Sequence, residues 1–488
     1  MGRHLFARGR TPGLLPLTDA ASTQNTRRSE DKFLMRDSLS LLGRVLLGNE
    51  ESESIRTRLV AGLGGLVGLR ITFGVLSFGL TIFLARVLAA KGFGAYSYAL
   101  AWTVLLGVPA ILGMDQLLIR EIAAYQLQSK WGLLRGLLRS ANAAVLLASV
   151  GIAGITLLVL WIMRGRWSGQ NLSTICIALL LLPLISLTRV RQAALQGLHR
   201  VVLGSTPERL IQPALLLAFV FIAYWYFHGQ LTTPFAMGLN VLATAIAFAI
   251  GARWLRRNLL PAVRQAPPEF RTRAWTRSAL PMAFLAGMGV LFGQAGTLIL
   301  GSIKGVSAVG IYSVADKGSE LLAFILVAQN AAFSSTAASL YASGDLVRLQ
   351  RLATRIARVT LLASLPLAVL FIGFGHWFLL FFYGAQYTQA QHALAILSFG
   401  QLVNVGMGLN SVLLMMTGHE RDAAAAVTVS AASNIVLNLL LVPKWGLEGA
   451  AISTACSLVL LNVLSSAALL RKTGIQSMVL GAHRENLC

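Results

Sequence analysis

The sequence predicts an all-α polytopic membrane protein with twelve transmembrane helices in two pseudo-symmetric six-helix lobes. Hydrophobic residues make up 56% of the 488 residues and charged residues only 12%, against about 25% in a soluble domain. Apolar runs of about 20 residues, the length that a bilayer core requires, recur along the chain. Only helices satisfy their own backbone polar groups within one such run, and the alternating pattern of an outer-membrane barrel is absent.

The twelve apolar runs follow one another with short polar connections, six before a basic segment and six after it. The expected spans are 59–84, 95–119, 140–163, 172–188, 208–227, 234–252, 279–303, 310–335, 359–382, 391–416, 423–442 and 447–470. The connections expected on the outer side are all short, so they leave no room for an external catalytic domain.

Basic residues divide unevenly between the two sides of these spans. With the N-terminus inside, 33 of the 41 Lys and Arg residues fall on the cytoplasmic side and 6 on the outer side. Cytoplasmic connections carry an excess of Lys and Arg, so we expect both termini in the cytoplasm. Orientation therefore explains most of the net charge of +23, and no nucleic-acid partner is needed. Arg70 and Lys317 remain within spans, and Arg209, at the cytoplasmic end of the span 208–227, is counted with the cytoplasmic residues.

The chain is expected to have five segments. They are a cytoplasmic Arg-rich tail (1–57), an N-lobe (58–255), a basic cytoplasmic linker (256–277), a C-lobe (278–470) and a cytoplasmic tail (471–488). Residues 32–48 have a helical apolar face and fit a helix on the inner membrane surface. The alternative is an unstructured leader from a wrongly chosen start codon, with Met35 as the true start.

Two short motifs recur in the two halves. Gly94–Ala99 and Gly310–Ala315 both read G-x-Y-S-x-A, and Gly197–Arg200 and Gly418–Arg421 both read G-x-x-R. The offsets are nearly equal and the places equivalent, which indicates a duplicated six-helix unit. Both halves begin on the same side, so the repeat is parallel, and transporters of this kind bind substrate at the repeat interface.

Several other kinds of site are not indicated. Cys176, Cys456 and Cys488 have neither metal-ligand spacing nor an obvious pairing, so no metal site and no disulfide framework is expected. The Walker A motif and the kinase signatures are absent, so ATP is not implied. We expect a transporter without a cofactor and not an enzyme.

Longer stretches of the sequence resemble a known family. They are Phe83–Arg86, Phe93–Ser97, Leu112–Asp115, Ile119–Ala123, Val309–Lys317 and the late run Asn434, Asn438 and Leu441–Ala451. Each is weak alone, but their order over about residues 57–470 resembles polysaccharide flippases of the Wzx type. These belong to the multidrug/oligosaccharidyl-lipid/polysaccharide exporter superfamily.

The resemblance implies a fold and a substrate. Such proteins have two six-helix lobes facing each other in a V, and the first, second, seventh and eighth helices line the cavity. They move an undecaprenyl-diphosphate-linked oligosaccharide to the outer leaflet, for lipopolysaccharide O-antigen or exopolysaccharide. Membrane lipids, a polysaccharide polymerase and glycosyltransferases are the implied partners. Alternating access would move the substrate, and a gradient of H⁺ or Na⁺ would supply the energy.

Arg70 is the first candidate site residue, because an Arg at the middle of a span costs about 2.5–3.5 kcal/mol and is seldom idle. A guanidinium suits phosphate geometry, so Arg70 would contact the diphosphate. The alternative is a structural ion pair with a carboxylate of another helix. Lys317 is a second candidate substrate contact. Gln294 is a third, either for sugar or as a polar contact between helices.

Asp316, Lys317 and Glu320 form a charged cluster in the eighth span. Asp316 and Glu320 share a helix face, and Lys317 reaches Glu320 at i+3. Arg70 and Glu320 are each expected near the midplane. Our hypothesis is that Glu320 and the lipid diphosphate compete for Arg70, and that H⁺ or Na⁺ at Asp316 and Glu320 resets the pair. The alternative is that Lys317 merely neutralises Glu320.

Asp115, Arg120 and Glu121 lie at the cytoplasmic end of the second span. They are candidates for an inner gate between the lobes. The alternative is that they cap a helix end and set topology.

Other function classes remain open. A multidrug cation antiporter of the same superfamily would need an acidic cavity, whereas the first span carries an Arg and no carboxylate. A polysaccharide polymerase or membrane glycosyltransferase would need a long external loop. A scaffold that recruits glycosyltransferases through its tail would fail when residues 1–50 are deleted, whereas a flippase would mostly keep working.

Overall fold

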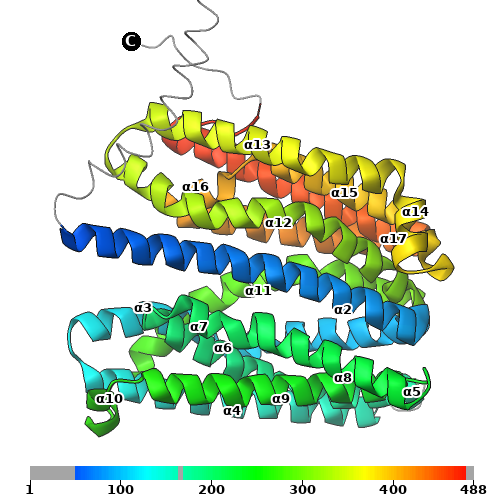
Figure 1. The fold of residues 1–488 in the computed structure, drawn as a ribbon, viewed down its shortest axis with the longest axis horizontal. Coiled ribbons are helices and arrows are strands. Elements are labelled where there is room, and N and C mark those ends of the chain that lie inside the picture. The colour runs from blue at the N-terminus through cyan, green and yellow to red at the C-terminus, as the bar shows by residue number, and fades with distance from the viewer. Residues whose placement is uncertain (1–49, 163–168, 480–488) are drawn as a thin grey trace, which may run out of the picture. The chain divides into compact units, whose positions relative to one another are not determined.

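The computed structural model describes residues 50–162 and 169–479, and every regular element in these ranges is a helix (Figure 1). The predicted surface helix at 32–48 lies outside the described residues. The helices of the first half are α2 (Glu50–Ile111), α3 (Met114–Leu127), α4 (Trp131–Ile162), α5 (Gly169–Leu179), α6 (Leu181–Gly197), α7 (Val201–Thr206), the π-helix η2 (Pro207–Ile211), α8 (Gln212–Tyr226) and α9 (Thr233–Asn258). The beginning of α2 up to Gly62 belongs to a separate unit, and the contacts below are those of residues 63–479.

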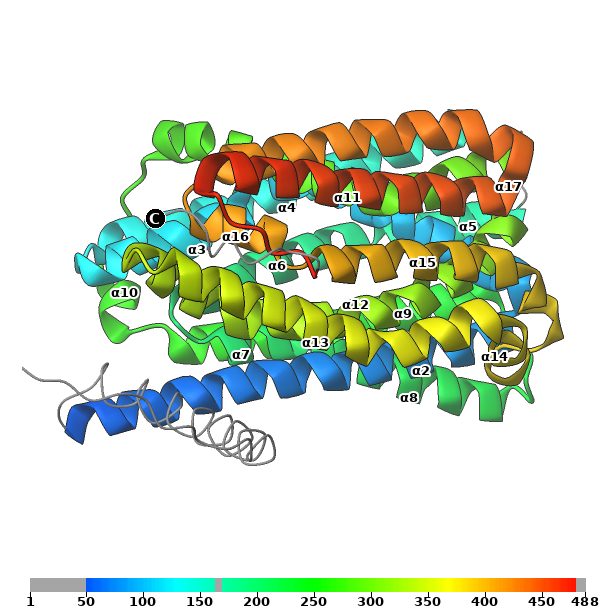
Figure 2. The same ribbon diagram turned by 90° about the horizontal axis from the view of Figure 1, so that it is seen from above.

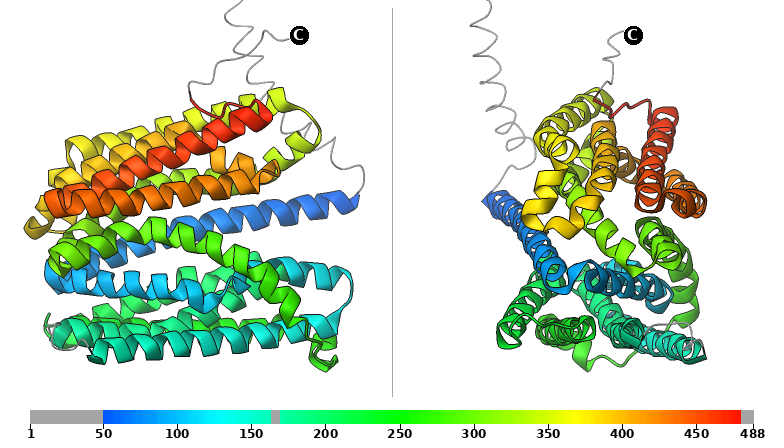
Figure 3. Two further views of the ribbon diagram at one scale, coloured as in Figure 1. Left: turned by 180° about the vertical axis from the view of Figure 1, so that it is seen from behind. Right: turned by 90° about the vertical axis from the view of Figure 1, so that its right-hand side faces the viewer.

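The second half follows a short connection that contains α10 (Pro261–Gln265), within the predicted basic linker. Its helices are α11 (Thr272–Lys304), α12 (Val306–Ala342), α13 (Leu346–Gly373), α14 (Gly375–Phe382), the 3-10 helix η3 (Ala385–Ala390), α15 (Gln391–Met407), α16 (Asn410–Met416) and α17 (Glu420–Thr473). Seen end on in the right panel of Figure 3, the yellow-to-red helices of the second half gather on one side. The cyan-to-green helices of the first half gather on the other.

The two longest helices, α2 and α17, are each two helices joined at one non-helical residue. The break in α2 is at Ala89, with φ 55° and ψ 174°, and the break in α17 is at Gly446, with φ 55° and ψ −119°. The prediction of loops at 85–94 and 443–446 is therefore wrong in their length, because helix continues on both sides of a single residue in each. Gly446 adopts positive φ without a Cβ clash, whereas an alanine at positive φ is strained.

Eight helices in the described part of the chain are long and apolar enough to cross a membrane. The bent pair Ala385–Met407 and Asn410–Met416 adds a ninth if it is counted as one span. The protein is therefore a multi-pass, all-helical membrane protein, and the count of twelve spans stays a prediction. Large apolar side chains such as Leu147, Trp225 and Leu362 stay exposed on these helices, as expected of side chains that face lipid.

Helix α11 connects the packing of the two halves. A hydrophobic cluster of α3, α4 and α6 includes Leu117 and Leu134, and it extends to Trp275 at the beginning of α11. The Trp275 indole N–H donates to the Tyr125 hydroxyl of α3 at 3.0 Å. Farther along, α11 packs along α17 of the second half (Figure 2). One helix thus contacts both halves of the repeat.

Candidate functional site

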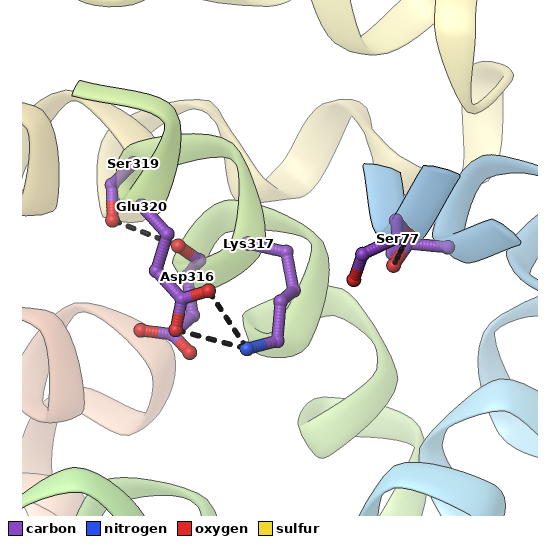
Figure 4. A network of polar contacts seen from close by, with 6 residues as sticks. Ser77, Asp316, Lys317, Ser319 and Glu320 are labelled. Atoms are coloured by element: carbon purple, nitrogen blue, oxygen red, sulfur yellow. Dashed lines mark hydrogen bonds and ion pairs between the residues drawn. The ribbon is translucent and has the colours of Figure 1, made fainter. Parts of the chain in front are cut away.

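One turn of α12 carries three charged side chains. Lys317 Nζ donates to both carboxylate oxygens of Glu320 at 2.9 Å each (Figure 4). The i, i+3 spacing places the two side chains on one face of the helix. Their side chains remain 45% and 44% exposed. Asp316 lies in the same turn, and Ser319 Oγ donates to its backbone carbonyl at 2.9 Å. The cluster is therefore an accessible ion pair with a second carboxyl group beside it.

Helix α2 lies across from this turn of α12. A Cβ atom added to Gly74 would be 3.1 Å from the Phe324 ring, so the two helices approach closely just beyond the cluster. Ser77 of α2 lies opposite Lys317 in Figure 4. Arg70 is one turn before Gly74, but its side chain lies outside the described part. The hypothesis that Glu320 pairs with Arg70 therefore stays a prediction, and the observed partner of Glu320 is Lys317.

Gln294 lies half-buried in α11, on the helix that adjoins the α12 cluster. Two residues later, a Cβ atom added to Gly296 would be 3.0 Å from the Tyr312 hydroxyl. Tyr312 precedes Asp316 by one turn of α12. The structure thus places Gln294 and Lys317 on adjacent helices, and none of the hydrogen bonds within the described ranges joins the two side chains.

The three candidate gate residues lie on α3 and interact locally. Asp115 Oδ1 accepts a hydrogen bond from the Gln116 backbone N–H at 2.9 Å, at the beginning of α3. Arg120 pairs with its neighbour Glu121 at 2.9 Å. Helix α3 packs against α4, α6 and the beginning of α11. These contacts are local to α3, whose N-cap residue Gly113 makes no side-chain cap hydrogen bond, and the role as an inner gate between lobes stays a prediction.

The end of the helix bundle at which α2 breaks, around Ala89, is tied to the second half of the chain by contacts that the sequence analysis missed. Arg86 donates to the backbone carbonyls of Phe381 and Phe382, where α14 ends. The Tyr387 hydroxyl donates to the Ala85 carbonyl at 2.8 Å. A cation at the last carbonyls of a helix also interacts favourably with the helix dipole. In the sequence Arg86 falls in the expected connection between the first two spans, and its acceptors are backbone atoms that no sequence pattern marks.

The two glycines of the repeated motif meet at this same end. A Cβ atom on Gly94 would be 1.8 Å from the Val306 carbonyl oxygen, and one on Gly310 would be 2.0 Å from the Ala90 carbonyl oxygen. The α2 and α12 backbones are therefore in direct contact, which only glycine permits at these positions. The repeated motif marks the place where the two halves close against each other.

The repeated tyrosines make equivalent contacts, each within its own half. The Tyr96 hydroxyl accepts from the Asn240 side-chain amide of α9 at 2.9 Å. The Tyr312 hydroxyl and the Thr454 hydroxyl of α17 are 3.1 Å apart. Both tyrosines are buried. Each motif thus links its helix to the last long helix of its own half, which supports the predicted duplication.

We expect Arg86→Ala to weaken closure at this end, because both N–H···O contacts from the guanidinium group to backbone carbonyls would be lost. One charge-assisted hydrogen bond contributes about 1.5–3 kcal/mol, so the closed population should fall about tenfold relative to the open one. Spin labels at His228→Cys and His376→Cys, in a background without the native cysteines, measure the separation. Lys91→Ala is the matched control, because Lys91 is an exposed cation of α2 near the same end. Unchanged distances in Arg86→Ala would contradict the prediction.

Comparisons with known proteins agree with this architecture. The family model described as "Polysaccharide biosynthesis protein" matches residues 59–336, and the MatE model matches residues 281–441. An uncharacterized membrane protein of Methanocaldococcus jannaschii is 24% identical over 399 residues, which are 76% of this chain and 77% of that protein. A Haloferax volcanii protein named "Probable flippase AglR" is 26% identical over 295 residues, 58% of each chain.

Solved structures share the fold at low sequence identity. An inward-facing multidrug resistance MATE family transporter of the MOP superfamily superposes with a TM-score of 0.65, at 13% identity, over 83% of this chain and 99% of that one. The lipid II flippase MurJ in an inward closed conformation gives 0.64, at 14% identity, over 83% and 87%. The chain belongs to the family of polysaccharide biosynthesis proteins and has the fold of the multidrug/oligosaccharidyl-lipid/polysaccharide exporter (MOP) superfamily.

Proposed function

We propose that this protein is a flippase that moves an undecaprenyl-diphosphate-linked oligosaccharide repeat unit from the inner to the outer leaflet of a bacterial inner membrane. The observation that carries the proposal is the accessible Lys317–Glu320 ion pair, on α12 where this helix faces α2. A diphosphate can replace the carboxylate as the partner of the ammonium group. Membership of a polysaccharide biosynthesis family supports a saccharide cargo, and the name of the Haloferax volcanii relative supports flipping.

Each candidate residue receives a role in this cycle. Lys317 and Arg70 bind the diphosphate, which cannot cross hydrocarbon without cations, and Gln294 contacts the sugar. Asp316 and Glu320 take up H⁺ or Na⁺ and so couple the cycle to an ion gradient. Asp115, Arg120 and Glu121 act as the inner gate. The contact between Gly94 and Gly310 closes the outer end in one half of the alternating-access cycle.

The orientation follows from the distribution of basic residues. Both termini and the linker around α10 lie in the cytoplasm, so the cluster of helix ends near Gly94 faces the outside. Glycosyltransferases in the cytoplasm supply the lipid-linked substrate, and a polysaccharide polymerase on the outer side consumes it. The cargo is a repeat unit of O-antigen or exopolysaccharide.

The test is reconstitution of the full chain into vesicles with a fluorescent undecaprenyl-diphosphate disaccharide. Transfer between leaflets is followed as protection of the fluorophore from a membrane-impermeant reductant, with and without an imposed H⁺ or Na⁺ gradient. We expect transfer to exceed that in protein-free vesicles and to respond to one of the two gradients. A rate equal to that of empty vesicles, with protein shown to be folded, would contradict the proposal.

A multidrug cation antiporter is the second candidate, and one observation favours it. The α12 cluster holds two carboxyl groups, Asp316 and Glu320, against one ammonium group. A cationic substrate would suit this excess of carboxyl groups. The same vesicles loaded with a lipophilic cationic dye separate the two functions, because an antiporter would move the dye and leave the diphosphate lipid in place.

A further inference from the structure

A basic cavity lies in the first half of the chain, on helices other than those of the α12 cluster. Its volume is about 630 Å³, and its walls come from α4, α6, α9 and α10. Five arginines line it: Arg135, Arg139, Arg191, Arg256 and Arg264. The lining contains no acidic residue, so the cavity concentrates positive charge in one place.

Backbone carbonyl groups hold two of these guanidinium groups in position. Arg135 Nη1 donates to the Ala266 carbonyl at 2.7 Å, and Arg191 Nη1 donates to the Phe248 carbonyl at 3.1 Å. The Arg191 guanidinium also lies 3.3 Å from the centre of the Phe248 ring. Neutral partners orient a guanidinium without neutralising it. Since each guanidinium has five N–H donors, most of them remain for a ligand.

Carboxylates do not compensate the five charges. Among residues 50–162 and 169–479, no Asp or Glu oxygen forms an ion pair with any of the five arginines. Glu269, the acid of the linker, lies instead at the beginning of α4, where its carboxylate approaches Gly132. Like charges around one cavity repel one another, and a bound anion would relieve that repulsion.

The rest of the lining is apolar and partly open to lipid. Leucines of α4, α6 and α9, and the one that follows α9, form this wall: Leu138, Leu146, Leu187, Leu255 and Leu259. Leu146 is 44% exposed, on a helix that is apolar enough to cross the membrane. The cavity lies at the end of α9 that leads into the basic linker, which the charge distribution assigns to the cytoplasmic side. A polar end beside an apolar wall at this depth matches a lipid in the inner leaflet.

We propose that this cavity binds the phosphate head group of an anionic phospholipid from the inner leaflet, with an acyl chain along the leucine wall. Guanidinium groups match phosphate oxygens in bidentate geometry. The lipid would tie α10, at the beginning of the connection between the halves, to α4 and α6. This site is separate from the α12 cluster and does not depend on the transported substrate.

The experiment titrates the purified full chain in detergent with phosphatidylglycerol or with phosphatidylcholine of the same acyl chains. Native mass spectrometry counts the lipids that remain bound. Each Arg near a membrane surface contributes about fivefold to anionic-lipid binding, so Arg139→Ala/Arg256→Ala should bind phosphatidylglycerol about 30-fold more weakly. Arg253→Ala/Arg257→Ala removes the same charge from exposed residues of α9 that do not line the cavity, and it should bind almost normally.

Two outcomes would overturn the proposal. Equal losses in the two double variants would mean that general surface charge, and not the cavity, attracts the lipid. Displacement of phosphatidylglycerol by equimolar inorganic phosphate would identify a free anion as the ligand. If the alanine variant does not fold, Leu146→Trp keeps all five arginines and fills the cavity beside the leucine wall. It should reduce phosphatidylglycerol binding, and normal binding would again contradict the proposal.

Discussion

Replacing Gly94 with leucine should abolish transport while the protein still inserts into the membrane. The first side-chain carbon alone would be 1.8 Å from the Val306 carbonyl oxygen and 2.7 Å from the Gly310 backbone nitrogen. Backbone atoms cannot rotate away as a flexible side chain can. The α2 and α12 backbones would have to separate, and these helices belong to different halves of the repeat. Alternating access requires each end to close in turn, so a chain that cannot close here cannot complete the cycle.

The size of the effect follows from the cost of overpacking. Forcing extra carbon atoms into a packed contact costs about 1–3 kcal/mol, and occasionally more. A shift of about 3 kcal/mol changes the ratio of two conformations by about 150-fold, so a mostly closed end would become mostly open. The labels at His228→Cys and His376→Cys should report a longer separation. Transfer of the fluorescent diphosphate lipid should fall to the level of empty vesicles.

Gly79→Leu is the matched control on the same helix. A Cβ atom at Gly79 meets nothing within 4 Å, so the same change in residue type should leave transport and the label separation almost unaltered. Gly310→Leu should reproduce the Gly94→Leu result, because its Cβ would meet the Ala90 carbonyl oxygen. Normal transport by Gly94→Leu would mean that this contact does not belong to the transport cycle.

Much of the fold follows from the sequence because apolar length and helical periodicity are local properties. The repeated G-x-x-R motif lies at a helix boundary in both halves, since α6 ends at Gly197 and α17 begins at Glu420. The breaks within helices were harder to predict. In place of an expected loop of ten residues, 85–94, the chain has one strained alanine at position 89 between helical segments.

The contacts of the candidate site are likewise of two kinds: local ones, which sequence spacing predicts, and distant ones, which it does not. The Lys317–Glu320 pair follows from its i, i+3 spacing, which any helix brings together. The acceptors of Arg86 are carbonyl groups almost 300 residues away, and no residue type marks them. The linker arginines fit a topology signal, yet Arg256 and Arg264 line one cavity with Arg135 of α4. Only the tertiary structure shows that these charges converge.

Replacing Lys317 with alanine should reduce transfer of the diphosphate lipid about tenfold to hundredfold. The ammonium group is the only described cation of the α12 cluster, and one charge-assisted hydrogen bond contributes about 1.5–3 kcal/mol. Its loss also leaves two carboxyl groups, Asp316 and Glu320, without a compensating charge in the same turn. Lys317→Arg keeps the charge and suits a diphosphate, so it should retain most of the rate. The measurement is the initial rate of fluorophore protection in vesicles.

Glu320→Gln separates the substrate role of Lys317 from the coupling role of the carboxylate. It removes the competitor that holds Lys317 in the structure, so the lipid should bind more tightly. Release of the lipid should then slow, and the response to an H⁺ or Na⁺ gradient should disappear. Unchanged gradient dependence in Glu320→Gln would exclude this residue from coupling.

Exchanging the two residues, as Lys317→Glu/Glu320→Lys, distinguishes transport from mere neutralisation. The exchanged pair can still form at i, i+3, so insertion and thermal stability should return to those of the native chain. The ammonium group, however, moves three positions along α12, about 4.5 Å at the rise of a helix. If Lys317 only neutralises Glu320, the exchange restores transport together with stability. If Lys317 binds the diphosphate, stability returns and transport stays low, because the cation no longer lies opposite Ser77 of α2.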